Sequence, residues 1–355
     1  MTTQFTMSFR RRALQALIVG ASMILMACTA GSENSTGPLP PLREAREDLV
    51  VGADHHIHIQ SAAAINAIGE LADLMPPEFR RSMETLPPVD ADDIISELDA
   101  AGINRAAVLS AAFLLEMPEA HEVWTSEERR AAVVAENDYA AEQVGLYPER
   151  LLLFCGINPL VDYALEEVTR CHDVLGARGV KIHLPTSNVD LRNGEHLQQL
   201  DSVFQHAARL GMPVLIHMAT RDPNFGAQDV ENFIGAVVVG NENLELYLLH
   251  MAGWGSSGSQ PHTALQAWIS ALNGGILTGR HGVYFETSGS YTRRIDNVRL
   301  AEQIEELGAE RIYFGSDWPA ILRPVYSTQN FWTHLPLDED IIVDVLDNRA
   351  SFFED

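Results

Sequence analysis

The segment Asp54-His55-His56-Ile57-His58 ends the first apolar run that follows a polar stretch of the chain. Side chains two apart on a β-strand point the same way, so His56 and His58 can bind one metal ion together while Ile57 faces the opposite side. Three further short apolar runs also end on residue types that bind metals, at His217, His250 and Asp317. This pattern predicts a metal site assembled at the ends of strands in a barrel.

From residue 49 onward, apolar strand-like runs alternate with amphipathic helical stretches, which is typical of βα units around a parallel sheet. We predict eight strands, at about residues 49–58, 105–110, 151–157, 179–184, 213–218, 245–251, 282–287 and 311–316. Helices are expected to end at the glycines that precede strands, at Gly102, Gly176, Gly211 and Gly308. The predicted fold is α/β, a (β/α)8 TIM barrel with its chemistry at the C-terminal strand ends.

Two connections are longer than a βα unit needs. Residues 61–98 follow the first predicted strand and residues 111–135 follow the second. Both are predicted to be helical insertions that lie over the mouth of the barrel, as a lid or as a dimer contact.

The N-terminal 27 residues differ in composition from the rest of the chain. Arg10-Arg11-Arg12 precede a neutral run that ends in Leu25-Met26-Ala27-Cys28. The run, about 14 residues, is shorter than the roughly 20 that span a bilayer. The segment resembles a bacterial lipoprotein signal that is cleaved before Cys28, which then carries lipid, with an ordinary signal peptide as the alternative.

This interpretation divides the chain into a signal peptide over residues 1–27, a flexible tether over 28–48 and a barrel domain over 49–355. The protein is then exported and anchored by lipid in the bacterial envelope. Thr29 stands where an aspartate is associated with inner-membrane retention, so the periplasmic side of the outer membrane is the expected location.

The chain is acidic, with a formal net charge of -25. Removal of residues 1–27 takes away three arginines and no carboxylates, which leaves 21 basic and 49 acidic residues and a net charge of -28. Such a body is not expected to bind nucleic acid or anionic lipid, so membrane contact is predicted only through the anchor. The remaining cysteines, Cys155 and Cys171, are expected to be buried free thiols, with a disulfide between them as the alternative in an exported protein.

The order of metal-binding residue types along the predicted strands is informative as a whole. His56-x-His58, Lys181, His217, His250 and Asp317 follow one another in an order that resembles the amidohydrolase superfamily, in particular its amidohydrolase-related branch. Phe314-Gly-Ser-Asp317-Trp-Pro319 and the segment 347–353 resemble the closing segments of that branch. The similarity covers residues 49–353.

The resemblance implies that His56, His58, His217 and Asp317 hold a divalent ion, for which Zn²⁺ is expected. Asp317 would also act as general base on a metal-activated water and then as acid for the leaving group, while His250 would orient the water or polarise the substrate. Lys181 stands where two-metal members carry a carboxylated lysine, which would make Lys181 and His250 ligands of a second ion. We favour one ion, with the Lys181 ammonium holding a substrate carboxylate.

Further substrate contacts are expected from loops that follow the strands. The candidates are His183, Trp254, Arg293 and Trp318, together with Arg221, Arg294 and Arg323. Asp54 and His55 are expected to support the His56-His58 pair or to pack beneath it.

These features predict a metal-dependent hydrolase that acts on an amide, ester or lactone of a small organic acid, with a carboxylate-bearing small molecule as its partner. A decarboxylase or hydratase on the same scaffold is the alternative. Some decarboxylases of the branch have Glu-x-His at the first strand, so His56 favours hydrolysis. A non-catalytic binding lipoprotein is a third interpretation, and the resemblance also implies pairing of two copies through barrel helices.

Overall fold

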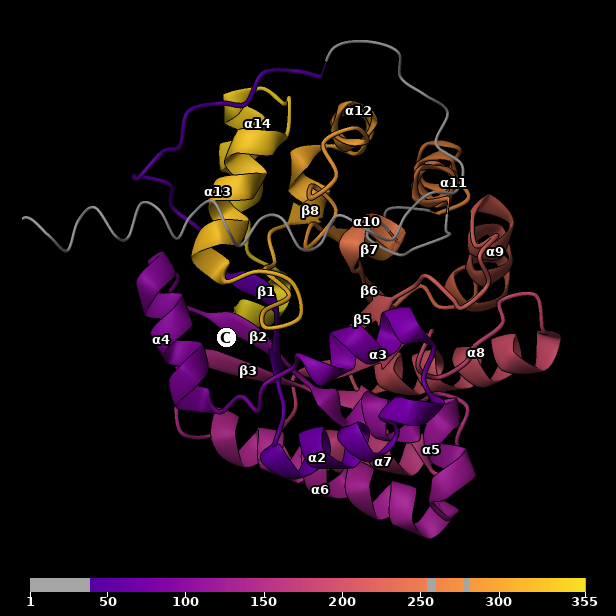
Figure 1. Cartoon of the computed structure of the whole chain (residues 1–355). Helices are drawn as coiled ribbons and strands as arrows, with labels where there is room; N and C mark the ends of the chain where they lie inside the picture. Colours follow the sequence, from indigo (N-terminus) through magenta and orange to yellow (C-terminus); the bar gives the residue numbers. More distant parts are fainter. Residues whose placement is uncertain (1–38, 254–259, 278–280, 355) are drawn as a thin grey trace, which may run out of the picture. The chain divides into compact units, whose positions relative to one another are not determined.

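The structure is a computed structural model and describes residues 39–253, 260–277 and 281–354. Its strands are parallel and pair in the order of the sequence, from β1 to β8. They are β1 Asp54–Ile59, β2 Ala106–Ser110, β3 Leu151–Ile157, β4 Gly179–His183, β5 Val214–His217, β6 Glu245–Leu248, β7 Gly282–Glu286 and β8 Ile312–Tyr313. The predicted (β/α)8 barrel is confirmed, and every predicted strand overlaps an observed one (Figure 1).

The barrel closes between β1 and the residues that follow the short strand β8. The amide of His55 donates to the carbonyl of Phe314 at 3.0 Å, and the amide of His58 donates to the carbonyl of Trp318 at 2.8 Å. Between them, the amide of Asp317 donates to the carbonyl of His56 at 2.7 Å. Backbone pairing therefore places Asp317 directly beside the two histidines of β1.

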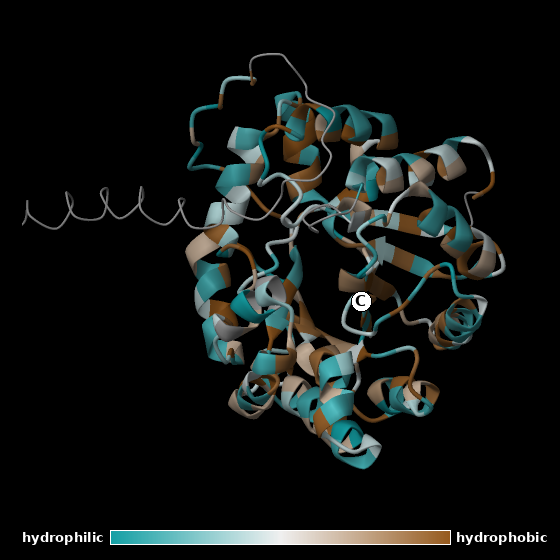
Figure 2. Ribbon diagram, turned by 45° about the vertical axis from the view of Figure 1, so that its right-hand side comes forward, coloured by the Kyte–Doolittle hydropathy of each residue, from teal (hydrophilic) through white to brown (hydrophobic). Residues whose placement is uncertain are grey.

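Helices surround the strands, and their hydrophilic and hydrophobic residues alternate along the ribbon, as expected for helices with one face on a sheet (Figure 2). They are α4 Ala91–Ala101, α6 Ser126–Val144, α7 Ala164–Asp173, α8 Gly194–Arg209, α9 Ala227–Phe233, α11 Pro261–Asn273, α12 Asn297–Leu307, α13 Pro324–His334 and α14 Glu339–Asp347. Gly102 ends α4 in the left-handed conformation, with φ 70°, as its position before a strand predicted.

Side chains alternate between the two faces of the strands. Ile57 and Ile59 belong to the core between sheet and helices, whereas His56 and His58 line a cavity at the C-terminal end of the barrel, as predicted. A separate apolar cluster, which does not line the cavity, includes Phe154, Tyr247, Phe352 and Phe353. His55 packs there, as predicted: its Nδ1 donates to the carbonyl of Phe314 at 2.8 Å and its Nε2 accepts from the amide of Ala350 at 3.1 Å.

The two insertions pack against each other. The first contains α2 Ala62–Glu70 and α3 Pro77–Glu84, and the second contains the 3-10 helix η3 Ala111–Glu116 and α5 Pro118–Val123. They share a second apolar core, to which Ile68, Leu71, Phe113, Leu115 and Met117 contribute. Both insertions line the cavity above the barrel, which confirms that they lie over its mouth.

An ion pair joins the second insertion to the loop after β5. Arg221 donates from its two terminal nitrogens to Glu119 Oε1 at 2.9 Å and to Oε2 at 3.1 Å. Its Nε also donates to the carbonyl of Pro185 at 2.7 Å. One guanidinium thus holds α5 to two barrel loops.

Residues 39–48 pack along α13, so the folded domain begins earlier than the predicted boundary at residue 49. The Arg43 guanidinium donates to the carbonyls of Trp332, Leu335 and Leu337 at the end of α13. The indole of Trp332 donates to the carbonyl of Glu44 at 2.9 Å. These bonds satisfy carbonyls that a helix end leaves without partners.

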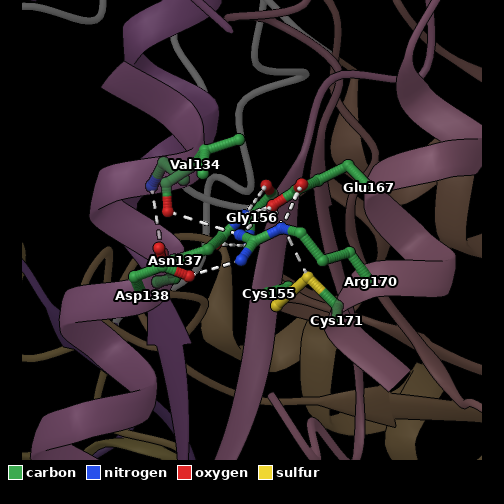
Figure 3. Close-up of a disulfide and its surroundings, with 10 residues drawn as sticks. Val134, Asn137, Asp138, Cys155, Gly156, Glu167, Arg170 and Cys171 are labelled. Carbon is green, nitrogen blue, oxygen red and sulfur yellow. Dashed lines mark hydrogen bonds and ion pairs between the residues drawn. A yellow bond between two sulfur atoms is a disulfide. The ribbon is translucent and has the colours of Figure 1, made fainter. Parts of the chain in front are cut away.

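Cys155 and Cys171 form a disulfide between β3 and α7, and both are fully buried (Figure 3). The expectation of free thiols is therefore wrong. Two cysteines with apolar surroundings are compatible with either state in a sequence, and only the packing of α7 on β3 brings these two together. A polar network lies beside them: Asn137 donates to Glu167 at 2.8 Å, and Arg170 pairs with both Glu167 and Asp138.

No helix in the described ranges is long and apolar enough to cross a membrane. The predicted signal peptide, the lipidation site Cys28 and the candidate substrate contact Trp254 lie outside the described residues.

Candidate metal centre

A cavity of about 160 Å³ opens at the C-terminal ends of the strands. Its lining includes seven titratable side chains from the ends of five strands, namely His56, His58, Lys181, His183, His217, His250 and Asp317. Its walls are mainly apolar and come from both insertions and from the loop after β8, with Met83, Leu86, Phe113, Leu114 and Ile321. The structure thus brings together all the residues predicted to form the metal site.

Electron pairs of three side chains converge in this cavity. Burial holds the pKa of His56 well below its usual value, so its imidazole is neutral, and its Nδ1 donates to Glu286 Oε2 at 3.0 Å. The His56 Nε2 is then an electron-pair donor, yet it lies 3.1 Å from His58 Nε2 and 3.3 Å from Asp317 Oδ1. Among the described residues, Asp317 Oδ1 has no hydrogen-bond donor. A cation among these atoms would satisfy the electron pairs of His56 Nε2 and Asp317 Oδ1 together, so the set fits a divalent metal.

Asp317 is suited to the anionic part of such a site. Burial alone would raise its pKa, but attraction to the positive charge that His56, His250 and His58 can carry and a hydrogen bond from His58 outweigh burial and keep the pKa well below its usual value. Its Oδ1 also lies 3.1 Å from His58 Nε2. The carboxylate is therefore ionised and available as a ligand or as a base.

His250 lies closer to this centre than the one-ion prediction required. Ligand atoms of His56, His250 and Asp317 all lie within 4.8 Å of one another. The His217 ring stands next to His250, with ring centroids 4.6 Å apart, and next to His183 at 4.3 Å. His250, which we predicted to act in catalysis or to bind a second ion, therefore belongs to the group of three potential ligands. His217, which we predicted as a ligand, lies next to His250.

A second layer of polar groups supports these side chains. Asp54 Oδ1 accepts from the amides of His56 and Ser316 at 3.0 Å each, as its position beside the histidine pair suggested. Glu286, at the end of β7, was not predicted from the sequence, and Ser288 was expected only as part of a loop that contacts substrate. Glu286 is fully buried, and burial raises its pKa. The sequence could have indicated Glu286, because β7 is another apolar run that ends on a carboxylate.

His250 and Asp317 both have left-handed backbones, with φ 55° each. His250 begins α10 His250–Gly253, in which Met251 and Ala252 also have positive φ values, of 49° and 63°. Residues other than glycine rarely adopt this conformation, and it costs of order 1 kcal/mol or more at each position. Strain of this kind concentrates at functional sites, where the fold must aim a side chain inward.

Lys181 is fully buried, and its Nζ has no hydrogen-bond partner within the described part of the chain. Burial lowers its pKa to about 7. The ammonium lies 5.9 Å from the centroid of the Phe113 ring, at the cavity wall. An isolated buried cation is costly, so this position suits an anionic group that arrives with a ligand.

His183 also lines the cavity, as one of the predicted substrate contacts. Its ring stacks on Phe113, with centroids 5.0 Å apart and an interplanar angle of 19°. Its Nδ1 lies 3.0 Å from Thr186 Oγ1, and burial keeps its pKa well below its usual value. A neutral imidazole and a phenyl ring thus stack on each other at the cavity wall.

The other predicted substrate contacts lie elsewhere. Arg293 is exposed and pairs with Asp296 at 3.1 Å, and Trp318 packs against the core beside β1. Neither lines the cavity. The remaining arginines have other partners: Arg221 binds Glu119, Arg323 binds Glu97, and Arg294 binds the carbonyl of Pro40. The positions of these arginines at the barrel rim did not reveal that they bind partners other than substrate.

The fold and the convergent imidazoles and carboxylate define a TIM barrel with a candidate metal centre at its C-terminal strand ends. A family model described as Amidohydrolase matches residues 53–346. The chain therefore belongs to the amidohydrolase family. No curated protein matches the chain.

Solved structures resemble the barrel over most of its length. A 5-carboxyvanillate decarboxylase from Sphingomonas paucimobilis has a TM-score of 0.58 and 16% identity, over 84% of this chain and 96% of that one. A dihydroxybenzoic acid decarboxylase from Polaromonas sp. JS666, solved with manganese and the inhibitor 2-nitroresorcinol, has a TM-score of 0.57 and 18% identity, over 86% and 99%. A protein described as amidohydrolase II has a TM-score of 0.59 and 16% identity, over 83% and 96%. At these identities the likeness establishes the shared fold.

Proposed function

We propose that this protein is a metal-dependent enzyme that decarboxylates a small aromatic carboxylic acid. The observation that carries the proposal is the Lys181 ammonium, which is buried without a hydrogen-bond partner among the described residues, at a cavity that also has an apolar wall of Met83, Leu86, Phe113, Leu114 and Ile321. An aromatic acid matches both properties, because its ring fits between apolar walls and its anionic group meets the cation. The decarboxylases among the similar structures support this choice over hydrolysis.

His56, His58 and Asp317 would hold one divalent ion, with His217 and His250 beside it. When bound, the ion would supply positive charge that orients oxygens of the substrate and stabilises negative charge during the reaction. Imidazole nitrogen with carboxylate oxygen suits Zn²⁺ and Mn²⁺ alike, and manganese in the Polaromonas structure makes Mn²⁺ the first ion to test.

The chain's own residues account for the proton and for orientation. Lys181 would hold an anionic group, and the Phe113 ring with its stacked partner His183 would hold the aromatic ring. The bond between the ring carbon and the carboxylate breaks, the electron pair stays on the ring carbon, and carbon dioxide leaves. The replacing proton would come from solvent: His250 would take it up at Nε2, pass it to Asp317 Oδ2, which lies 3.9 Å away, and Asp317 would deliver it to the ring carbon.

The test is release of carbon dioxide from a panel of hydroxybenzoates by the full chain supplied with Mn²⁺ or Zn²⁺. Elemental analysis of the same samples should find about one ion per chain, and His56→Ala should lose it. A protein without bound metal that releases no carbon dioxide from any of these acids would contradict the proposal.

Hydrolysis is the second candidate, and His56 is the observation that favours it. Neutral imidazoles at both positions of β1 would leave more positive charge on a bound ion than a carboxylate would, and such an ion would supply the charge that activates water for hydrolysis. Hydrolysis of lactones or esters of small acids, without release of carbon dioxide, would reverse the order of the two candidates.

We also propose that the protein is exported and anchored by lipid on Cys28. The disulfide between Cys155 and Cys171 supports export, because such bonds persist in oxidising compartments. Cells that make the full chain should incorporate labelled palmitate into it, and Cys28→Ala should remove the label. Label that remains in the Cys28→Ala variant would contradict the proposal.

Pairing of two copies through barrel helices stays a prediction, to be tested by the mass in solution.

A further inference from the structure

Ser288 occupies a bridging position between two histidines that come from different strands. Its Oγ lies 3.1 Å from His56 Nδ1 and 3.0 Å from His250 Nδ1. It also donates to Glu286 Oε2 at 2.9 Å. All four side chains are buried, and Ser288 and Glu286 are fully so.

The positions of the protons follow from which groups can only accept. His250 Nδ1 lies 2.9 Å from the carbonyl oxygen of Ser288, and a carbonyl has no proton to give, so this nitrogen carries one. The single hydroxyl proton of Ser288 points to Glu286, which leaves the lone pairs of Oγ to accept from both imidazoles. His56 Nδ1 likewise donates to Glu286 Oε2 at 3.0 Å.

We propose that Glu286 and Ser288 are positioning residues that set one tautomer, with the proton on Nδ1, in His56 and His250 together. In that tautomer the Nε2 electron pairs of both rings face the cavity, where they lie 3.3 Å and 3.9 Å from oxygens of Asp317. The opposite tautomer would turn an N–H into the cavity and prevent that ring from ligating an ion or accepting a proton.

Backbone bonds hold this pair in its place. The amide of Ser288 donates to Glu286 Oε1, and the amide of His250 donates to Glu286 Oε2 at 3.3 Å. Glu286 therefore contacts both histidine strands and the loop after β7. The consequence for turnover rests on the proposed function, whereas the tautomers themselves do not.

The tautomers can be measured on the full chain labelled with ¹⁵N-histidine and free of metal. Long-range proton–nitrogen NMR spectra should show His56 and His250 protonated at Nδ1 and unprotonated at Nε2. Either ring protonated at Nε2 in the wild type would overturn the proposal, whatever reaction the enzyme catalyses.

Metal affinity gives a second readout. Titration with Zn²⁺ should show about 10-fold to 100-fold weaker binding in Ser288→Ala and Glu286→Gln than in the wild type, while Ser288→Thr, which keeps the hydroxyl, should retain most of the affinity. Ser290→Ala is the matched control, since Ser290 is a buried serine of the same loop whose hydroxyl donates to the carbonyl of Thr287 rather than to either histidine. Equal losses in Ser290→Ala and Ser288→Ala would overturn the proposal. Absence of decarboxylation with both readouts as expected would count against the proposed function alone.

Discussion

His250 and Asp317 follow different strands, yet both have a backbone φ of 55° and their Nε2 and Oδ2 atoms lie 3.9 Å apart. The amide of Asp317 bonds to β1, and the amide of His250 bonds to Glu286 on β7. Two strained strand ends are thus each tied by the backbone to a neighbouring strand. The fold uses this strain to aim an acid and an imidazole at one point.

Asp317→Asn should lower turnover by about 100-fold to 10,000-fold, because an amide neither accepts nor delivers the proton. The variant should keep its fold and bind metal more weakly than the wild type. Steady-state kinetics and elemental analysis would check both. Asp296→Asn is the control, since Asp296 pairs with Arg293 away from the cavity. Wild-type turnover in Asp317→Asn would remove Asp317 from the reaction.

Lys181 predicts how substrate affinity depends on pH. Burial lowers its pKa to about 7, so the ammonium that would bind an anionic substrate is lost as the pH rises through that value. We expect KM to rise by about 10-fold per pH unit above pH 7, by ordinary titration of one site. Lys181→Met should raise KM at pH 6 and remove this dependence.

The stability of Lys181→Met provides an independent check. The folded pKa lies below the unfolded value of 10.5, so the buried ammonium destabilises the fold below pH 7 and this effect fades as the pH rises towards 10.5. The methionine variant should therefore be more stable than the wild type at pH 6, with a smaller difference at pH 9. Denaturant unfolding measures this stability difference at both pH values. An equal difference at pH 6 and pH 9 would show that Lys181 is not the group that titrates.

Arg221→Ala should loosen the second insertion. It removes both bonds to Glu119, whose side chain is only 7% exposed, and the bond to Pro185. The partly exposed pair is expected to contribute about 1 kcal/mol. Hydrogen exchange should become faster over Ala111–Val123 and stay unchanged in the strands. Arg192→Ala is the control, since Arg192 forms ion pairs with Asp222 and Asp229 at the same rim. Equal exchange in both variants would contradict the role of Arg221.

Replacement of both Cys155 and Cys171 by alanine should destabilise the fold. The disulfide closes a loop with a sequence separation of 16, for which about 3 kcal/mol is expected. Thermal unfolding should shift down by about 5 °C or more, and reductant should shift the wild type but not the variant. Alkylation of both Cys155 and Cys171 in unreduced, denatured wild-type protein would show that the bond does not form.

The barrel could be predicted because its signals are local. An apolar run of strand length, a glycine at a helix end and a polar residue at a strand end are each set by neighbours in the chain. The position of His56, His58, Lys181, His217, His250 and Asp317 at one cavity then follows from the geometry of a parallel barrel, whose strand ends all face the same side.

Other features depend on contacts between distant residues. The sequence shows Cys155 and Cys171 but not that α7 brings them together, and it shows Arg293 but not that Asp296 pairs with it at the surface. It shows Glu286 at a strand end, but not that Ser288 lies between His56 and His250.

The sequence by itself determined the barrel, the inward direction of the histidines and the family, because strand periodicity and strand order are properties of the chain. Only the tertiary structure decided that residues 39–48 pack on α13, that both cysteines pair, and which of the predicted polar side chains reach the cavity. The reason is that a side chain's partner depends on backbone positions set by closure of the whole barrel and on competition for burial, which no local pattern contains.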